Sequence, residues 1–218
     1  FGLPTRTVDA WGPAVARLAH LNFTGALTHF AQSDELDKTF ARRQFAGFQE
    51  CVAVLRRLGL SLPCLHSCNS GGFLDLPEAH LDMVRVGILG LGVYPSSVCR
   101  RLPGLAPVMN VKARLTALQH LEPGDTVGYG MRFRAESPRR IAVLPLGYGD
   151  GFPRVRNEGA ALIRGRRAPL VGGVSMDALT VDVTDIPEAR LGDEAVLMGR
   201  QGDLEITAHE LAALKRSV

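Results

Sequence analysis

The chain has 218 residues, a hydrophobic fraction of 46%, a charged fraction of 22% and a formal net charge of +3. These values are ordinary for a globular protein of one large or two medium domains. The basic residues are scattered, which argues against nucleic acid as the main partner. No apolar run approaches the ~20 residues that span a bilayer, and we find no signal peptide, so we expect a cytoplasmic protein without a membrane partner.

The cysteines do not indicate a metal site. Cys64 and Cys68 flank His66, but this spacing matches no common zinc pattern and no second ligand pair follows. Buried free thiols in a reducing cytosol explain the cysteines better, because a protein in that compartment keeps its thiols reduced. We therefore expect no metal.

The first half of the chain alternates between helix and strand patterns. Thr7 can cap a first helix, and Ser33 or Asp34 can begin a second, which Gly59 stops. The patterning predicts, in order, a helix to about residue 18, a buried strand over 23–30, a helix with Phe45, Phe48, Val52 and Leu55 on one face, a buried strand over 62–67, a short helix or turn over 74–79, and a buried strand over 83–88.

This order of elements is that of parallel βα units. Their spacing fits part of a TIM barrel, in which working residues lie at the carboxyl ends of strands. His29, residues 66–70 and Gly87 are predicted at such ends. A closed barrel needs eight strands and only about three are predicted. We therefore expect residues 1–106 to form the C-terminal part of a (β/α)8 barrel, with the chain beginning partway through it.

From about Pro107 the pattern changes to short β-like runs separated by turn signals such as PGD, GDG and RGRR. A capping box from Thr207 to Glu210 predicts a final helix that runs into the C-terminus. The runs cover 111–118, 141–146, 161–163, 170–173, 178–183 and 194–198. The predicted fold class is therefore an α/β partial TIM barrel followed, over 107–218, by a mainly antiparallel β domain. Whether this β domain is truncated is left open.

Arg85 stands inside a predicted buried strand. A buried guanidinium must be hydrogen-bonded, because an unpaired charge in that position costs several kcal/mol. One interpretation pairs it with a carboxylate such as Asp82. The other directs it at a ligand acceptor at the mouth of the barrel, with His66 from the neighbouring strand end as a supporting partner. The residues alone leave both open.

Several glycine-marked stretches can build a site. The sequence NSGG at Asn69 and the pair Gly87–Ile88 supply a hydroxyl and backbone N–H groups for a phosphate, although any loop can be rich in serine and glycine. Tyr129 and Tyr148 each have glycine on both sides, which frees the backbone and lets other groups approach. The alternative is that these tyrosines only cover hairpin turns, and that residues 172–177 only form a bulge.

Six motifs together resemble those of alanine racemases in order and spacing. They are THF at His29, HSCNS at His66, MVRVGI at Arg85, VGYG at Tyr129, GYGDG at Tyr148 and SMD at Met176. The resemblance runs from Thr24 to the GRQGD at Gly199. It implies a pyridoxal 5'-phosphate (PLP) enzyme that interconverts L- and D-alanine through a PLP aldimine, with a lysine and a tyrosine as its two bases. It also implies a head-to-tail homodimer.

The resemblance assigns roles to residues at matching positions. Arg85 would donate to the pyridine nitrogen of PLP, His66 would orient Arg85, and His29 would lie beside the ring. Tyr129 would be the general base on the L-alanine face, and Met176 would offer its backbone N–H to the substrate carboxylate. Tyr148 would narrow the entrance, and the phosphate would be held by Ser70, Gly87 and Ile88.

The chain also departs from the family pattern. The Schiff-base lysine, which the family carries in a VKANAYGHG-like stretch, is absent, and the lysines present are Lys38 at the start of a surface helix, Lys112 and Lys215. We therefore expect a catalytically inactive fragment of an alanine racemase. The alternatives are a serine or broad-specificity racemase of the same family, and a non-catalytic binding module derived from it. A related decarboxylase is disfavoured, because those enzymes pair the pyridine nitrogen with an acidic residue.

Overall fold

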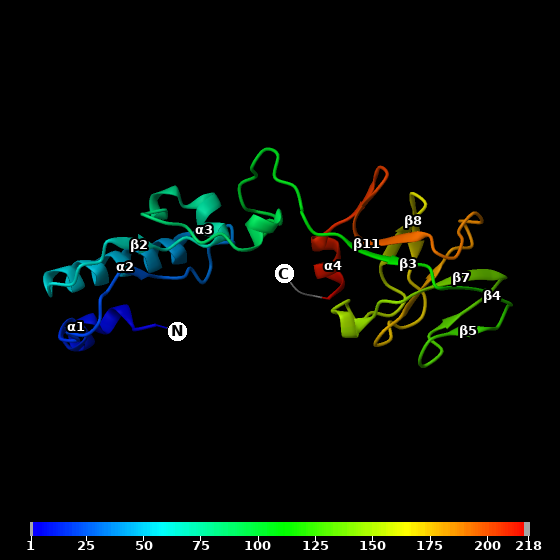
Figure 1. The fold of residues 1–218 in the computed structure, drawn as a ribbon, viewed down its shortest axis with the longest axis horizontal. Helices are drawn as coiled ribbons and strands as arrows, with labels where there is room; N and C mark the ends of the chain where they lie inside the picture. Colours follow the sequence, from blue (N-terminus) through cyan, green and yellow to red (C-terminus); the bar gives the residue numbers. More distant parts are fainter. Residues whose placement is uncertain (1, 216–218) are drawn as a thin grey trace. The chain divides into compact units, whose positions relative to one another are not determined.

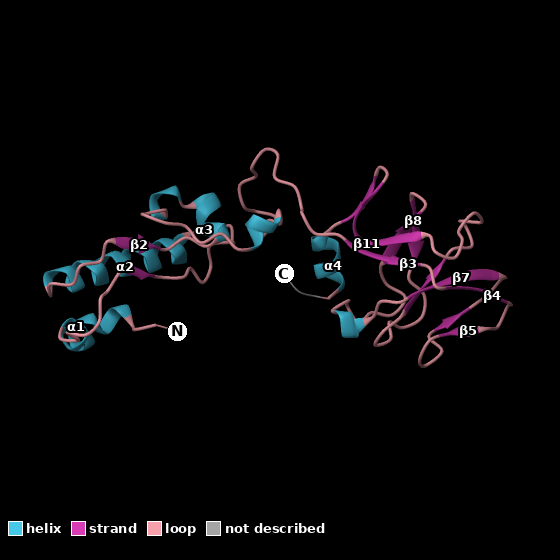
Figure 2. Cartoon of the chain, viewed as in Figure 1, coloured by secondary structure: helices cyan, strands magenta, loops and turns pink. Residues whose placement is uncertain are grey.

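The computed structural model describes residues 2–215. The chain divides into two compact units, residues 1–107 and 108–218 (Figure 1). The first unit combines helices with a small parallel sheet, and the second is mainly antiparallel sheet (Figure 2). This confirms the predicted fold class of an α/β part followed by a mainly antiparallel β part. No helix within residues 2–215 has both the length and the apolar character to cross a membrane.

The helices of the first unit differ from the predictions mainly at their starts. The helices are α1 (Val8–Ala16), α2 (Thr39–Arg57) and α3 (Ser70–Asp75), with 3-10 turns at Thr5–Thr7, Pro77–Ala79 and Ile88–Leu91. Thr7 is at the N-cap of α1, but its hydroxyl donates to Pro4 O and does not cap. The predicted apolar face of α2 is buried, and Gly59 follows its end at φ +88°, as predicted.

The second helix starts at Thr39 and not at Ser33 or Asp34. The ammonium of Lys38 donates to the carbonyls of Ser33 and Glu35, so these carbonyls do not enter the helix. Ser33 itself is fully buried. A lysine that folds back onto the preceding turn therefore delays the helix, which the hydrophobic pattern could not show.

The sheet of the first unit is smaller than predicted. Strands β1 (Gly25–Leu27) and β2 (Cys64–His66) pair in parallel, and both are only partly buried. The predicted third strand over 83–88 is wrong. Met83 makes one parallel bridge to His66, and the chain turns into a 3-10 helix at Ile88. Within the described residues, this segment has a strand neighbour on one side only, so its backbone hydrogen bonds do not form a regular ladder.

The second unit contains two main sheets. One has the strand order β10-β7-β4, and the other has the order β12-β11-β8-β9 with β3 also paired to β11; β5 and β6 form a separate hairpin. The strands are β3 (Val111–Arg114), β4 (Ala117–Leu121), β5 (Thr126–Val127), β6 (Phe133–Arg134), β7 (Arg139–Leu144), β8 (Ala160–Ile163), β9 (Arg166–Pro169), β10 (Leu179–Asp182), β11 (Glu194–Gln201) and β12 (Leu204–Ile206). Their inward side chains build a main core, which includes Leu144, Val181 and Leu197, and a smaller cluster of Leu162, Val196 and Ile206.

Two predictions in this unit need correction, and the predicted cap of the final helix is confirmed. The run 111–118 splits at buried Leu115, where the chain passes from one sheet to the other. The strand predicted over 170–173 lies earlier, at β9, because Arg164 and Gly165 form a two-residue hairpin turn with positive φ. In the final helix α4 (Ala208–Leu214), the Thr207 hydroxyl accepts from Glu210 N, as predicted. The last residues, 216–218, lie outside the described part.

Candidate functional site

Arg85 lies at the centre of a cluster built from three segments of the first unit. One terminal nitrogen of its guanidinium hydrogen-bonds His66 Nδ1. The other lies 2.8 Å from Thr28 O, 3.3 Å from Ser67 O and 3.3 Å from His29 Nδ1. These acceptors follow β1 and β2, so the carboxyl ends of both strands converge on this one side chain.

The partners of Arg85 are histidine nitrogens and backbone carbonyls. The alternative that Asp82 neutralises it is wrong, because the Asp82 carboxylate accepts from Leu65 N at 2.8 Å, and no carboxylate of the described chain pairs with Arg85. Burial and the nearby Arg85 charge lower the pKa of His66, which keeps Nδ1 free to accept. Within the described residues the Nε–H of Arg85 makes no hydrogen bond. The cluster fixes the guanidinium and leaves its Nε–H among the donors that are available.

A cavity of ≈ 370 Å³ lies beside Arg85. Its lining includes His29, Ser70, Gly87 and Ile88. The Ser70 hydroxyl accepts from Gly87 N at 3.0 Å and from Leu89 N at 3.3 Å, which joins the start of α3 to the turn after residue 86. The structure therefore brings together at one cavity the residues that were predicted from separate strand ends.

The composition of the stretch NSGG allowed a loop, but the structure has the start of a helix there. The stretch forms the cap and first turn of α3, where the Asn69 side chain accepts from Gly72 N at 3.0 Å. Buried Ser33 donates to the same Asn69 oxygen at 2.6 Å. Sequence reasoning named Ser33 only as a possible start of the second helix, and the asparagine before a short polar-to-apolar run was the one signal that could have placed the cap.

Lys38 is not a surface residue. Its ammonium lies 2.8 Å from Asp75 Oδ2, and each of the two side chains is only 12% exposed. Burial raises the pKa of Asp75, but hydrogen bonds from Lys38 and from Arg100 N outweigh that effect, and the pKa lies below its ordinary value. Lys38 is therefore held as half of a buried ion pair. Nothing in the helical pattern predicted this, because the partners are far apart in the sequence.

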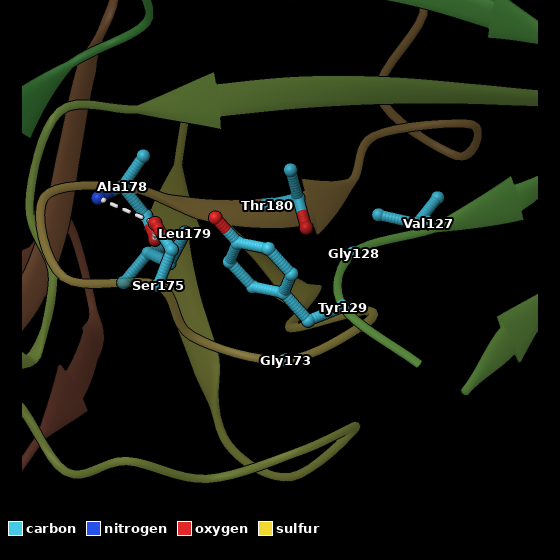
Figure 3. A pocket seen from close by; sticks show the side chains of 8 residues that line it. All are labelled: Val127, Gly128, Tyr129, Gly173, Ser175, Ala178, Leu179 and Thr180. Carbon is cyan, nitrogen blue, oxygen red and sulfur yellow. Dashed lines mark hydrogen bonds between the residues drawn. The ribbon is translucent and has the colours of Figure 1, made fainter. Parts of the chain in front are cut away.

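Tyr129 lines a second cavity, of ≈ 380 Å³, which belongs to the second unit. Figure 3 shows its ring crossing this cavity, with the hydroxyl directed away from Gly128 and toward the segment Ser175–Leu179. The side chain is 82% exposed. Gly128 has φ +74°, and a Cβ on it would lie 3.0 Å from Gly173 N, so a larger residue would be strained and crowded there.

Tyr148 and Met176 are brought together by backbone contacts. Tyr148 N donates to Ser175 O at 3.0 Å, and Gly149 N donates to Met176 O at 2.7 Å. A Cβ on Gly147 would lie 2.3 Å from Ser175 O, so only glycine permits this approach. Met176 is at the tip of the turn and 61% exposed.

The interactions of Tyr148 and Met176 leave specific groups available. The Tyr148 ring lies 5.1 Å from the guanidinium carbon of Arg154. The N–H of Met176 donates to no acceptor within residues 2–215. The turn therefore leaves a backbone donor at Met176 without a partner in the described chain.

The remaining ionisable residues do not assemble a metal site within residues 2–215. Cys51, Cys68 and Cys99 are buried and free, and burial raises the pKa of each thiol, which favours the protonated form. The candidate chemistry therefore lies in two clusters, one around Arg85 in the first unit and one around Tyr129 in the second.

Comparison with known proteins identifies the family. The model of the alanine racemase N-terminal domain matches residues 1–95, and the model of the alanine racemase C-terminal domain matches residues 108–218. The chain belongs to the alanine racemase family. This confirms the resemblance drawn from the six motifs, and it places the chain among relatives of PLP-dependent isomerases.

Curated alanine racemases match almost the whole chain. The protein from Syntrophobacter fumaroxidans is 44% identical over 214 residues, which cover 98% of this chain and 57% of that protein. The one from Symbiobacterium thermophilum is 41% identical, over 100% of this chain and 58% of that protein. The chain therefore spans somewhat more than half the length of these relatives.

Solved alanine racemases share the fold. The structure from Bacillus anthracis with bound L-Ala-P has a TM-score of 0.90 at 29% identity and covers 99% of this chain and 56% of that chain. The structure from Bartonella henselae with covalently bound pyridoxal phosphate has a TM-score of 0.85 at 26% identity, over 100% and 58% of the two chains.

Proposed function

We propose that this chain is the distal portion of a PLP-dependent alanine racemase that interconverts L- and D-alanine in the cytoplasm. The observation that carries this proposal is the Arg85 cluster: a guanidinium fixed by histidine nitrogens and backbone carbonyls, with its Nε–H left over, beside a cavity that the Ser70 hydroxyl and Gly87 help to line. The family membership supports it.

The residues around this cavity fit PLP. Its volume of ≈ 370 Å³ is in the range of small-molecule sites. The free Nε–H of Arg85 suits an acceptor such as a pyridine nitrogen, and Ser70, Gly87 and Ile88 offer a hydroxyl and backbone groups for a phosphate. When bound, PLP makes the Cα–H of an amino acid acidic.

Arg85 would limit that activation. A guanidinium does not give up its proton, so the pyridine nitrogen that faces it stays largely unprotonated and withdraws electrons less. His66 keeps the guanidinium in place through Nδ1, and His29 would lie beside the ring. This arrangement restrains side reactions such as transamination.

Tyr129 would serve as the general base on the L-alanine face. A phenol can take a proton in the transition state when its neighbours stabilise the phenolate. The free N–H of Met176 would receive the substrate carboxylate, and Tyr148 would narrow the entrance. We propose that these residues act in a head-to-tail homodimer, with Tyr129 and Met176 serving the PLP of the other subunit.

This polypeptide by itself is proposed to be inactive, because none of its lysines suits a Schiff base. Lys38 is held by Asp75, and Lys112 lies 3.1 Å from Glu194 on the neighbouring strand. Lys215 follows the end of α4. The second base of the exchange would be a lysine outside this sequence.

The direct test uses the full-length protein that carries this chain and its Tyr129→Phe variant. Single-turnover hydrogen exchange at Cα should be almost abolished for L-alanine and far less affected for D-alanine, because the phenol acts on one face only. Equal losses from both isomers would contradict the role of Tyr129.

The absence of the family's Schiff-base lysine from this sequence also supports a second candidate, a non-catalytic binding module. Upstream coding sequence distinguishes the two: a reading frame that continues into a VKANAYG-like stretch favours the racemase, and a start codon at residue 1 favours the module. Racemisation of serine or several amino acids is a third candidate, decided by comparing turnover of alanine and serine.

A further inference from the structure

One short segment, residues 33–38, holds the helix α3 at both ends. At the amino end, the Ser33 hydroxyl donates to Asn69 Oδ1 at 2.6 Å, and Asn69 in turn caps Gly72 N. At the carboxyl end, Lys38 pairs with Asp75 at 2.8 Å. Because α3 has only six residues, these two attachments fix its whole length.

The ammonium of Lys38 joins the two attachments. Besides Asp75, it contacts Ser33 O at 2.8 Å and the carbonyl of Glu35. Lys38 therefore fixes the position of Ser33 through the Ser33 carbonyl, and the Ser33 hydroxyl fixes the position of the Asn69 side chain. The fit is tight, since a Cβ on Gly71 would lie 2.9 Å from both Ser33 O and Ser33 Oγ. A displacement of the segment would thus move the first turn of α3.

Ser70 is the first residue of that turn. Its hydroxyl binds the backbone N–H groups of Gly87 and Leu89, in the wall of the cavity beside Arg85. Its place depends on the Asn69 cap on one side and on the Lys38–Asp75 pair at the far end of the helix. The pair itself does not line the cavity.

We propose that the buried Lys38–Asp75 ion pair is a positioning pair: through Ser33 and Asn69 it holds Ser70 where the phosphate of the cofactor binds. This rests on the proposed function, because that function supplies the phosphate. The pair is largely buried and each partner makes a further hydrogen bond, so removing one partner should leave an uncompensated charge at the end of the helix.

The test compares pyridoxine 5'-phosphate with pyridoxine, neither of which can form a Schiff base. Lys38→Met should weaken binding of the phosphate ester by about tenfold, the effect of one displaced hydrogen bond, and leave binding of pyridoxine unchanged. Calorimetric titration of the full-length protein measures both. A structural role without positioning would weaken both ligands equally, and that result, or no change in either, overturns the proposal.

The matched control is the ion pair Arg42–Glu78. It also links α2 to the segment after α3, at 3.1 Å, but its side chains are 60% and 46% exposed. Arg42→Met should therefore change the affinity for neither ligand. If Lys38→Met does not fold, Asp75→Asn takes its place with the same expected result. Failure of both variants to fold would make the pair a folding determinant and overturn the proposal.

Amide hydrogen exchange separates this inference from the proposed function. Without any ligand, Lys38→Met should accelerate exchange of the Gly72 amide, which donates to Asn69, whereas Arg42→Met should not. Unchanged exchange overturns the positioning role. If the unmodified protein binds both ligands equally while the exchange result holds, the phosphate site and hence the proposed function fail, but the attachment of α3 by Lys38 stands.

Discussion

The two units hold their candidate residues by different physical means. In the first unit, the Arg85 guanidinium is oriented by the hydrogen bonds that it donates to His66 and to backbone carbonyls at the ends of β1 and β2. In the second, Tyr129 and Tyr148 are placed by backbone segments that touch where glycine leaves room. The first arrangement should therefore be sensitive to the loss of polar groups, and the second to the addition of a methyl group.

The largest effect is expected from Gly147→Ala in the second unit. The new methyl would meet Ser175 O at 2.3 Å and Met176 O at 2.4 Å, both of them backbone atoms that cannot rotate away. We expect the free energy of unfolding of this unit to fall by about 3 kcal/mol. Amide exchange of buried Val181 and Leu197 under increasing denaturant measures it.

The control for this prediction is Gly173→Ala. A Cβ at this position has only an ordinary contact, 3.6 Å to Arg156 Cγ, and the backbone φ is not positive. The cost should stay below about 1 kcal/mol. If Gly147→Ala and Gly173→Ala lowered the free energy of unfolding equally, the close backbone approach at Gly147 would not determine the position of the Tyr148 turn.

The next effect is expected from Arg85→Leu in the first unit. Loss of a charged hydrogen-bond donor should lower the affinity for pyridoxine 5'-phosphate by about 10- to 100-fold. Arg57→Leu, at the exposed end of α2, is the matched control and should change nothing. Titration calorimetry decides, and an unchanged affinity in the Arg85 variant would remove Arg85 from the cofactor site.

A smaller effect compares the two helix caps. Asn69 caps α3 at 3.0 Å and Thr207 caps α4 at 3.1 Å. Replacing either by alanine should cost about 1 kcal/mol. Asn69→Ala should cost more, because it also leaves the buried Ser33 hydroxyl without its acceptor. Amide exchange within each helix measures both free energies. A larger loss of stability for Thr207→Ala would contradict the role of Ser33 and Asn69 in holding α3.

The smallest effect concerns pH. The pKa of His66 is lowered by burial and by Arg85, so the unfolded chain binds this proton more readily than the folded chain does. The contribution of His66 to stability is then complete above a pH of about 6.5 and decreases as the pH falls through the lowered pKa. His66→Gln, which offers a neutral acceptor at every pH, should flatten part of the decline in denaturation midpoint between about pH 7 and pH 5. If the denaturation midpoints of the unmodified protein and of His66→Gln fell in parallel over this pH range, the contribution assigned to His66 would be contradicted.

The sequence predicted the convergence of His29, His66 and Arg85, because carboxyl ends of parallel strands meet at one edge. It could not predict that the segment after Met83 lacks a regular ladder, since pairing depends on which strands lie alongside. The surface position expected for Lys38 was wrong for a similar reason. Its partner Asp75 is distant in sequence, and a helical pattern carries no information about such a contact.

In the second unit, the glycines around Tyr129 and Tyr148 indicated close backbone approach, and the structure has it. The β9 strand was missed because its sequence, RRAP, has two arginines and a proline and lacks the β-branched and aromatic residues that indicate a strand. The roles of the site residues stay predictions, as do the boundary at residue 106 and the origin of residues 1–106 in a barrel.

The central claim is that Arg85 presents an N–H to the pyridine nitrogen of PLP. Nitrogen-15 NMR of the full-length protein loaded with PLP labelled at the ring nitrogen tests it most directly. The account predicts the shift of an unprotonated, hydrogen-bonded pyridine that changes in Arg85→Leu. A pyridinium shift, or a shift that is the same with and without the guanidinium, would contradict it.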